Sequence, residues 1–433
     1  MQREYRYQTG DQALVRQINL SVILNYLREN APVSRAVLAE MTGLNKTTVS
    51  SLVTELIEHH FVREIGLENA RTGRSAGRLG MLLMLNPAAG CIVSAEIGVD
   101  FISVICTNFA PAMIWQQVEC IEPDKGQDEI IQRTLALLNL AVAAGMKSCN
   151  TLLGIAIGVP GLVDMKSGTL LFAPNLKWRD TPLHDLLSDH FDAPLVVANE
   201  ASMAALGEHY FGAARGHNEV LYISVGVGLG GGIVNHGRVY NGVSGFGGEF
   251  GHMTMDPDGE LCNCGNRGCW ETLVSQRALF RYVTEEIQHG YSSLLPQLAG
   301  EGLDDLTVAM IANAAEAGDV AAMRALDRLG RYLGIGIASL VNALNPELVV
   351  FGGSLSLAGE RLLWIVNEEM NCRALRWNRE ATRVILARHG SHACVMGGVA
   401  TIYQNVLAKP IGMGASTDWA YPQVVNYPSA SLY

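Results

Sequence analysis

The stretch GFGGEFGHMTMDPDGELCNCGNRGCWE, residues 245–271, concentrates the chemistry of this chain. Its 27 residues include three glutamates, one histidine, three cysteines and seven glycines. Cys262, Cys264 and Cys269, with His252 ten residues before the first of them, have the composition and spacing of a tetrahedral zinc site. We predict that these four side chains hold a structural zinc ion, because four protein ligands leave no open position for a catalytic water. The alternative is that the cysteines are ordinary packing residues.

Glu249, His252 and Glu271 bracket these ligands, so a bound metal would fix all three side chains in space. Carboxylate and imidazole groups are suitable hydrogen-bonding partners for hydroxyl groups. We therefore interpret this stretch as one wall of a sugar-binding pocket.

The composition is that of an ordinary globular protein of two or three domains, with 433 residues, 49% of them hydrophobic and 17% charged. No stretch is apolar and long enough to span a bilayer, and the polar N-terminus has no secretory signal. We expect a cytoplasmic protein without a membrane partner. The net charge of −11 is uneven, since residues 1–80 carry +2 and the remainder −13. The N-terminal part is therefore the part that nucleic acid would not repel.

Residues 1–86 have the pattern of a winged helix-turn-helix DNA-binding head. Ser34 can cap a short helix, Thr42–Leu44 forms a tight turn, and Asn45 can cap a second helix with one apolar stripe. The alternative is a small helical packing module. The polar face of the second helix can enter the major groove and contact phosphates and base edges through Asn45, Lys46, Thr47, Thr48, Ser50 and Ser51.

A basic loop follows the helices. Strands are predicted at residues 61–65 and 79–85, and GLENARTGRSAGR (residues 66–78) joins them. Arg71, Arg74 and Arg78 in this loop fit a wing that contacts the minor groove or the DNA backbone. The alternative is that these three arginines lie in a solvated linker.

From residue 87 onwards, strands and helices alternate in two similar rounds. Each round begins with a strand meander, at residues 91–118 and 219–234. We predict two related α/β lobes. Their expected bounds are residues 87–200, closed by a helix at 396–407, and residues 201–395, which include the metal loop. Residues 408–433 are expected to form a flexible tail.

Further polar residues fall where predicted strands end, which is where ligands bind in α/β folds. Gly161 and the pair Asn199-Glu200 each follow such a strand, and Asn175 lies between them. An Asx-turn at Asn175 and a helix N-terminal acid at Glu200 are the structural alternatives to ligand contacts. The glycine-rich segment 226–232 either cradles a phosphate or forms a tight hairpin.

At this point the chain resembles the ROK family (repressors, open reading frames and sugar kinases) over residues 10–407. The head, which ends in TGLNKTTVSSLVTELIE, resembles the xylose-repressor branch of that family. The motifs that carry the resemblance are GVPG (158–161), APNLKW (173–178), ANEASMAALGE (198–208), GVGLGGG (226–232), GEFGH (248–252), CNCGNRGCWE (262–271) and NALNPELVVFGG (342–353).

The resemblance implies an α/β fold in which a winged helix precedes a two-lobe, actin-like and hexokinase-like (ribonuclease H-like) ATPase fold, with the sugar in the cleft. It implies zinc on His252, Cys262, Cys264 and Cys269. His252 would then bind zinc through one ring nitrogen and a sugar hydroxyl through the other. The implied sugar contacts are the Gly161 backbone, Asn175, Asn199, Glu200, Glu249, His252 and Glu271.

The chain departs from the family's kinases in both phosphate loops and at the catalytic base. The kinases read D-x-G-G-T in their first phosphate loop, where this chain has Glu96-Ile97-Gly98-Val99-Asp100. Val99 would hinder a close approach of the backbone, and the Asp100 carboxylate would repel phosphate. The second loop has Val227 in place of threonine, and Glu200 stands at the position of the catalytic aspartate. We therefore expect no enzymatic activity, with Glu200 as the base if the protein is a kinase.

We predict a sugar-responsive DNA-binding repressor that xylose or a related monosaccharide releases from its operator. A homodimer or higher homo-oligomer would recognise a roughly palindromic operator. The first alternative is an ATP-dependent ROK sugar kinase with a fused DNA-binding head. An activator, or a repressor controlled by a partner protein, is a further alternative.

Overall fold

A computed structural model describes residues 12–67, 80–122, 125–300 and 302–410. Arg71, Arg74 and Arg78 of the predicted wing and most of the predicted tail lie outside these residues. Among the described helices, none is both long and apolar enough to cross a membrane.

The head contains the predicted helix-turn-helix. Gly43 ends α2 with a left-handed backbone (φ 70°), and the Asn45 side chain caps α3 by accepting a hydrogen bond from the Thr48 N–H at 2.8 Å. A three-stranded sheet completes the head in the order β1-β3-β2, so the strands on both sides of the predicted wing pair with each other. The elements are α1 (Gln12–Asn30), β1 (Val33–Ser34), α2 (Arg35–Thr42), α3 (Lys46–Glu58), β2 (Val62–Leu67) and β3 (Met81–Leu85).

The body contains two five-stranded sheets with the same topology, as the recurring sequence pattern predicts. In each sheet, three antiparallel meander strands are followed by two parallel strands on the other side of the first strand. The first sheet consists of β4 (Cys91–Ile97), β5 (Phe101–Asn108), β6 (Met113–Cys120), β7 (Leu152–Val159) and β11 (Leu195–Asn199). The second consists of β12 (Glu219–Val225), β13 (Leu229–Asn235), β14 (Arg238–Val239), β15 (Leu348–Gly352) and β16 (Arg383–Leu386).

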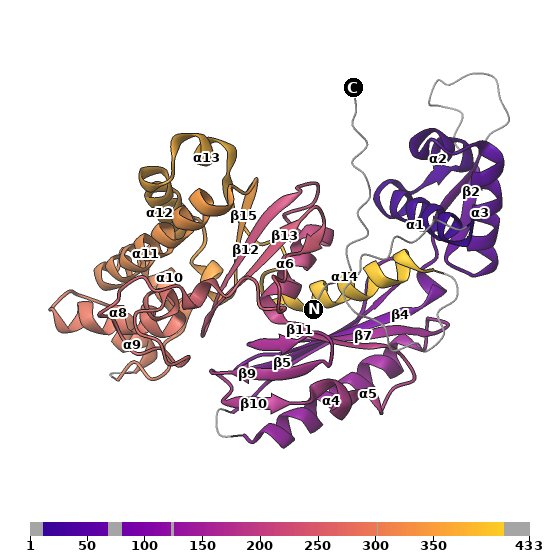
Figure 1. The fold of residues 1–433 in the computed structure, drawn as a ribbon. Coiled ribbons are helices and arrows are strands. Elements are labelled where there is room, and N and C mark those ends of the chain that lie inside the picture. Colours follow the sequence, from indigo (N-terminus) through magenta and orange to yellow (C-terminus); the bar gives the residue numbers. More distant parts are fainter. Residues whose placement is uncertain (1–11, 68–79, 123–124, 301, 411–433) are drawn as a thin grey trace, which may run out of the picture.

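Two helices form a central layer between the sheets (Figure 1). Helix α14 (Ala393–Ala408) packs on β4 and β7 of the first sheet, whereas α6 (Glu200–Phe211) packs on β12 and β13 of the second. The two helices also pack extensively against each other. The expected lobe boundary at residue 200 thus falls on the first residue of α6, inside this shared layer.

The alternation of side chains along each strand divides the core into layers. On β12, Val220 and Tyr222 face the central helices, while Leu221 and Ile223 face the helices on the outside of the second sheet. Helices α4 (Gln127–Gly145) and α5 (Leu183–Ser188) cover the outside of the first sheet. The helices of the second lobe are α7 (Trp270–Val274), α8 (Gln276–Gln288), α9 (Leu295–Ala299), α10 (Val308–Glu316), α11 (Val320–Leu344), α12 (Gly359–Arg373) and α13 (Arg376–Ala381).

Pro174 and Pro182 suggest a loop-rich region before β11, and this expectation is wrong. This segment forms a small antiparallel sheet of β8 (Leu162–Asp164), β9 (Thr169–Ala173) and β10 (Trp178–Thr181). Neither proline interrupts a strand, because Pro174 lies in the turn after β9 and Pro182 lies directly before α5. Both positions tolerate proline.

The head is anchored to the body by aromatic rings. Phe61 of the head contacts Phe109 at a centroid distance of 5.3 Å, and Phe109 contacts Tyr403 of α14 at 5.2 Å. The Arg28 guanidinium carbon lies 4.8 Å from the centre of the Tyr210 ring near the end of α6. Phe61, Phe109 and Tyr403 belong to one continuous core that spans the head and the central helices, and Tyr210 packs against it. The head therefore rests on the ends of α6 and α14.

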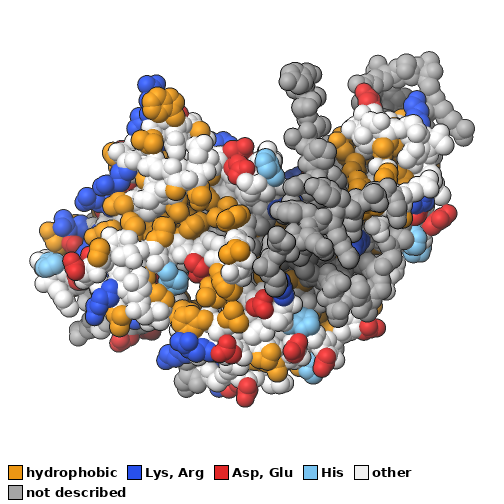
Figure 2. Space-filling model, viewed as in Figure 1, with side chains coloured by type: hydrophobic (Ala, Val, Ile, Leu, Met, Phe, Trp, Pro, Cys, Tyr) orange, Lys and Arg blue, Asp and Glu red, His pale blue; other side chains and the backbone are white. Residues whose placement is uncertain are grey.

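The surface of the body is mixed in character. Figure 2 shows acidic and basic side chains on both lobes, with hydrophobic side chains gathered on the lobe that carries α11 to α13. Trp364 of α12 and Leu375 and Trp377 at the start of α13 are exposed hydrophobic side chains of this lobe, with 65%, 60% and 76% of their surface exposed.

Candidate functional site

A cavity of about 460 Å³ is lined by residues from both lobes. Its walls come from the ends of β4, β7 and β11, from the β12–β13 hairpin, and from the starts of α6 and α14. The structure brings together in this cavity every residue that we predicted to contact sugar, namely Gly161, Asn175, Asn199, Glu200, Glu249, His252 and Glu271.

On the first-lobe side, Asn199 connects three parts of the wall. Its amide nitrogen donates to the Gly161 carbonyl oxygen at 3.1 Å and to the Glu200 carboxylate at 3.0 Å. Its amide oxygen caps α6 by accepting from the Ser202 N–H at 3.0 Å. Asn199 therefore positions Gly161 and Glu200, and both of its amide hydrogens have partners within the protein. Asn175 lies in the turn between β9 and β10.

On the second-lobe side, Glu271 links the hairpin to the metal loop. One carboxylate oxygen accepts from the Leu229 N–H at 2.9 Å, and the other lies 3.8 Å from the Cys262 sulfur. Glu249 lies beside His252, with 3.9 Å between its carboxylate and the His252 Nε2 atom. His252 therefore presents Nε2 to the cavity side and Nδ1 to Cys262, at 3.8 Å from the sulfur.

The glycine-rich segment 226–232 forms a tight hairpin, in which the Gly226 N–H donates to the Gly228 carbonyl oxygen at 2.8 Å. Its glycines are required by close packing. A methyl group on Gly228 would lie 2.6 Å from a Glu271 oxygen and 2.9 Å from the Asn175 nitrogen, and one on Gly232 would lie 2.6 Å from the Ala205 methyl. The hairpin thus lets side chains of both lobes approach the same point.

His252, Cys262, Cys264 and Cys269 form a cluster that can bind a metal ion, with their ligand atoms all within 4.8 Å of one another. The Cys264 and Cys269 sulfurs are 3.7 Å apart. Two thiolates bound to one tetrahedral metal at about 2.3 Å would be separated by roughly 3.8 Å. The donor set and the spacing of these two sulfurs therefore fit a tetrahedral ion.

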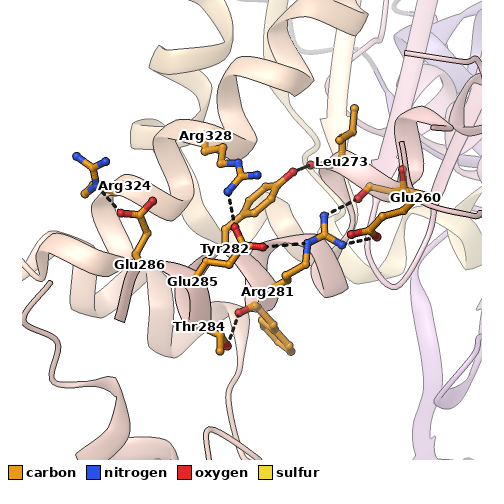
Figure 3. Close-up of polar contacts among 11 residues, drawn as sticks. Glu260, Leu273, Arg281, Tyr282, Thr284, Glu285, Glu286, Arg324 and Arg328 are labelled. Carbon is orange, nitrogen blue, oxygen red and sulfur yellow. Dashed lines mark hydrogen bonds and ion pairs between the residues drawn. The ribbon is translucent and has the colours of Figure 1, made fainter. Parts of the chain in front are cut away.

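A network of charged and polar contacts holds the metal loop against α8 (Figure 3). Arg281 forms an ion pair with Glu260 of the loop at 2.5 Å and donates to the Thr272 carbonyl oxygen at 3.0 Å. The neighbouring Tyr282 hydroxyl donates to the Leu273 carbonyl oxygen at 3.0 Å. These bonds attach the middle of the loop, and the short helix α7 that follows it, to a helix of the second-lobe core.

Sequence reasoning missed two residues that shape the cavity. Asn263, between the first two cysteines, donates from its amide nitrogen to the Asn175 oxygen at 2.9 Å and so joins the metal loop to the first lobe. Glu96 lines the cavity at the end of β4, although we had considered it only as a departure from a phosphate loop. Its place two residues before Gly98, near the end of a strand, was the signal that could have identified it.

Glu96 and Glu200 of the cavity are protonated more readily than a carboxyl group in water. Burial raises the pKa of Glu96 to about 8. Burial also raises the pKa of Glu200 well above its usual value, and the nearby charges of Glu249 and Glu96 raise it further. At neutral pH, hydroxyl groups of a ligand can therefore meet protonated as well as ionised carboxyl groups.

The predicted DNA-contacting residues of α3 lie together on one face of the head. Lys46, Thr47, Ser50 and Ser51 are exposed, whereas Thr48 is partly buried. Asn45 is exposed as well, but its side-chain oxygen is engaged in the cap of α3. The opposite face of α3 is buried through Val49, Leu52, Val53 and Leu56.

Comparisons with known proteins agree with this arrangement. The model of the ROK family matches residues 92–405, and a winged helix-turn-helix DNA-binding model matches residues 18–63. The xylose repressor of Caldicellulosiruptor bescii is 33% identical over 401 residues, which cover 93% of this chain and 99% of the relative.

Two solved structures are also similar. A ROK family transcriptional regulator, a homologue of the Escherichia coli MLC protein, matches with a TM-score of 0.77 and 28% identity, over 92% of this chain and 97% of its own. A ROK family glucokinase from Streptomyces griseus, in complex with glucose and AMPPNP, matches with a TM-score of 0.65 and 33% identity, over 71% and 98%. The glucokinase therefore corresponds to only part of this chain.

Replacing Glu96 with glutamine should reduce the loss of stability on raising the pH. Between a pKa of 4.5 in the unfolded chain and about 8 in the folded one, the folded chain retains a proton that the unfolded chain releases. Stability associated with this proton is present below the unfolded pKa and is lost as the pH rises towards 8. Urea unfolding midpoints at about pH 5 and about pH 8 should therefore differ less in Glu96→Gln than in the parent. The exposed Glu58→Gln is the matched control, and equal pH dependence in all three proteins would contradict the burial of Glu96.

Proposed function

This chain belongs to the ROK family, and we propose that it is a sugar-responsive DNA-binding repressor, located in the cytoplasm. The observation that carries the proposal is the presence of two sites in one chain. A cleft lined by polar side chains lies between two lobes, and a helix-turn-helix head rests on the helices that begin in that cleft. The full-length relative named xylose repressor supports the same combination.

We propose that the effector is xylose or a related monosaccharide. It would contact the backbone of Gly161 and the side chains of Asn175 and Glu200 on one lobe, and those of Glu249, His252 and Glu271 on the other. Asn199 would act mainly by holding Gly161 and Glu200, because its amide hydrogens are already engaged. A ligand that bridges both walls would favour a closed cleft.

The head would bind operator DNA through the exposed face of α3. Asn45, Lys46, Thr47, Thr48, Ser50 and Ser51 would contact bases and phosphates, and Arg71, Arg74 and Arg78 would contact the minor groove or the backbone. Two heads in a homodimer or higher homo-oligomer would read a palindromic operator. The exposed Trp364, Leu375 and Trp377 provide an apolar surface of the kind found at protein–protein contacts.

The central helices provide a route from the cleft to the head. Glu200 at the start of α6 and Cys394 at the start of α14 line the cavity, while Tyr210 and Tyr403 near the ends of these helices contact the head directly or through Phe109. Helices move as rigid units, so a shift at the cleft would be transmitted to the head. Near-complete release of the operator requires roughly 5.5 kcal/mol of differential affinity.

We propose further that the protein is not a kinase. Val99, Asp100 and Val227 line the cavity where the family's kinases bind phosphate. Among the described residues of the lining there is no lysine or arginine to balance the charge of a nucleotide. The similarity to a glucokinase favours the alternative, an ATP-dependent sugar kinase with a fused head and Glu200 as its base.

We propose zinc as the ion of the His252, Cys262, Cys264 and Cys269 cluster, because three thiolates and one imidazole are a common ligand set of structural zinc. Bound zinc would fix the loop and polarise no reacting group. The chain's own residues would do the recognition, with His252 Nε2 and the neighbouring Glu249 directed to the cavity side.

Saturating xylose, or another sugar of a panel, should lower operator affinity at least about 100-fold, as a population shift of the head requires. The measurement is a gel shift on operator DNA selected from a random pool. Lys46→Ala should weaken DNA binding without changing sugar affinity. Unchanged operator affinity across the panel would contradict the function. Sugar-dependent release of ADP from ATP in a coupled assay would favour the kinase instead.

Phe109→Leu should weaken the response to sugar, because it loosens the ring contact between Phe61 of the head and Tyr403 of α14. We expect unchanged sugar affinity and a several-fold smaller ratio of operator affinities without and with sugar, in line with coupling energies of about 0.5–2 kcal/mol. Phe280→Leu, on α8 and away from the head, is the matched control. A full response in Phe109→Leu would show that this contact does not transmit the signal.

Cys264→Ser should remove the metal. Inductively coupled plasma emission spectroscopy should find about one zinc ion per chain in the parent and little in the variant. The variant should also unfold at a lower temperature, because metal binding contributes folding free energy. Cys372→Ser, an exposed cysteine outside the cluster, should retain the zinc. Normal zinc content in Cys264→Ser would exclude the ligand set given above.

A further inference from the structure

The cavity extends well beyond the residues proposed to contact a monosaccharide. Two glycines of the β12–β13 hairpin face different parts of the lining. Gly228 lies against Glu271 and Asn175, whereas a methyl group on Gly226 would lie 3.5 Å from the Ser354 oxygen. The Gly226 carbonyl oxygen also accepts from the Gln276 N–H at 2.8 Å. Gln276 and Ser354 therefore belong to a distal end of the cavity.

This distal end has the lining of a carbohydrate site. Ser354 donates to the Gln276 side-chain oxygen at 3.2 Å, and Ser356 of the same segment supplies a further hydroxyl group. Such groups can both donate and accept hydrogen bonds, as sugar hydroxyls require. Leu357, which follows Ser356 in the chain, adds an apolar side chain to the lining. Leu357 lines the cavity and 64% of its surface is exposed, so its side chain can contact the apolar face of a sugar ring.

Charge argues against an anion at this end. Asp100 lies in the lining of the cavity, and the described lining residues include no lysine or arginine. A phosphate group would meet this carboxylate without a compensating cation from the protein. The total volume of about 460 Å³ lies in the range that accommodates ligands of drug size, larger than one pyranose ring.

We propose that the distal end is a second subsite for an uncharged sugar unit, and that the effector that fills the cleft best is a neutral disaccharide or glycoside. The first unit occupies the end near Glu249, His252 and Glu271. The second lies between Leu357 and the serines of the distal end. This inference rests on the proposed sugar-sensing function and specifies the class of its ligand.

The test is isothermal titration of the full chain with xylose and xylobiose, and with glucose and cellobiose. We expect the disaccharide of at least one pair to bind about tenfold tighter than its monosaccharide, because it makes contacts at both ends. Ser354→Phe, which fills the distal end, should reduce this ratio to near one without changing monosaccharide affinity. Retained operator binding shows that the variant is folded.

Leu357→Ser provides a second variant at an exposed position, with the similarly exposed Leu298→Ser as its control. Leu357→Ser should lower disaccharide affinity at least threefold, and Leu298→Ser should not. Two results would overturn the second subsite and leave sugar sensing intact. One is that disaccharides bind no tighter than monosaccharides. The other is that a magnesium nucleotide binds to the parent chain and no longer binds to Ser354→Phe. Failure of every sugar to bind would instead overturn the proposed function, and this inference with it.

Discussion

The close contact between α6 and α14 is the constraint on which the rest of the body depends. A methyl group on Gly397 of α14 would lie 1.7 Å from the Met203 carbonyl oxygen, and one on Gly207 of α6 would lie 2.5 Å from the Ala393 carbonyl oxygen. Only glycine fits at these positions, because the backbones of the two helices touch. Each helix also packs on a different sheet, so their separation sets the distance between the lobes.

Glu208 extends this contact to the wall of the cavity. Its buried carboxylate accepts hydrogen bonds from the backbone N–H groups of Ala213 at 2.7 Å, Arg388 at 3.1 Å and His389 at 2.7 Å. It thereby fixes the segment that leads into α14, including Gly390 and Ser391 of the cavity lining. Unpaired buried N–H groups are costly, so this carboxylate determines where α14 begins.

Local patterns predicted the parts of the fold in which neighbours in sequence are neighbours in space. The metal ligands lie within 18 residues, and their spacing alone identified the cluster that the structure assembles. The helix-turn-helix and the repeated strand meander were likewise readable from caps, turns and periodicity. Of helix α6 only the start was anticipated, as the alternative role of Glu200 as a helix N-terminal acid, because the helix is buried over most of its first eight residues and has little amphipathic pattern. The sheet at residues 162–181 was hidden by prolines that proved to lie outside the strands.

The cavity was predictable only in part, for a different reason. Motifs named its polar residues, but a pairing such as Asn175 with Asn263, 88 residues apart, depends on how the lobes meet. The same holds for Glu96, whose pKa of about 8 results from burial that only the assembled sheets produce. Side chains that acquire their properties from tertiary contacts leave no local trace in the sequence.

The direction of the central helices has an electrostatic consequence. Both begin at the cavity and end under the head, so the positive ends of two helix dipoles point at the cluster of carboxylates and the negative ends point towards Arg28. Each carboxylate near a helix start gains on the order of 0.3–1 kcal/mol from such a dipole. The polarity of the peptide backbone thus offsets a small part of the electrostatic cost of grouping glutamates in the pocket, and a cation lies at the opposite pole of the same helices.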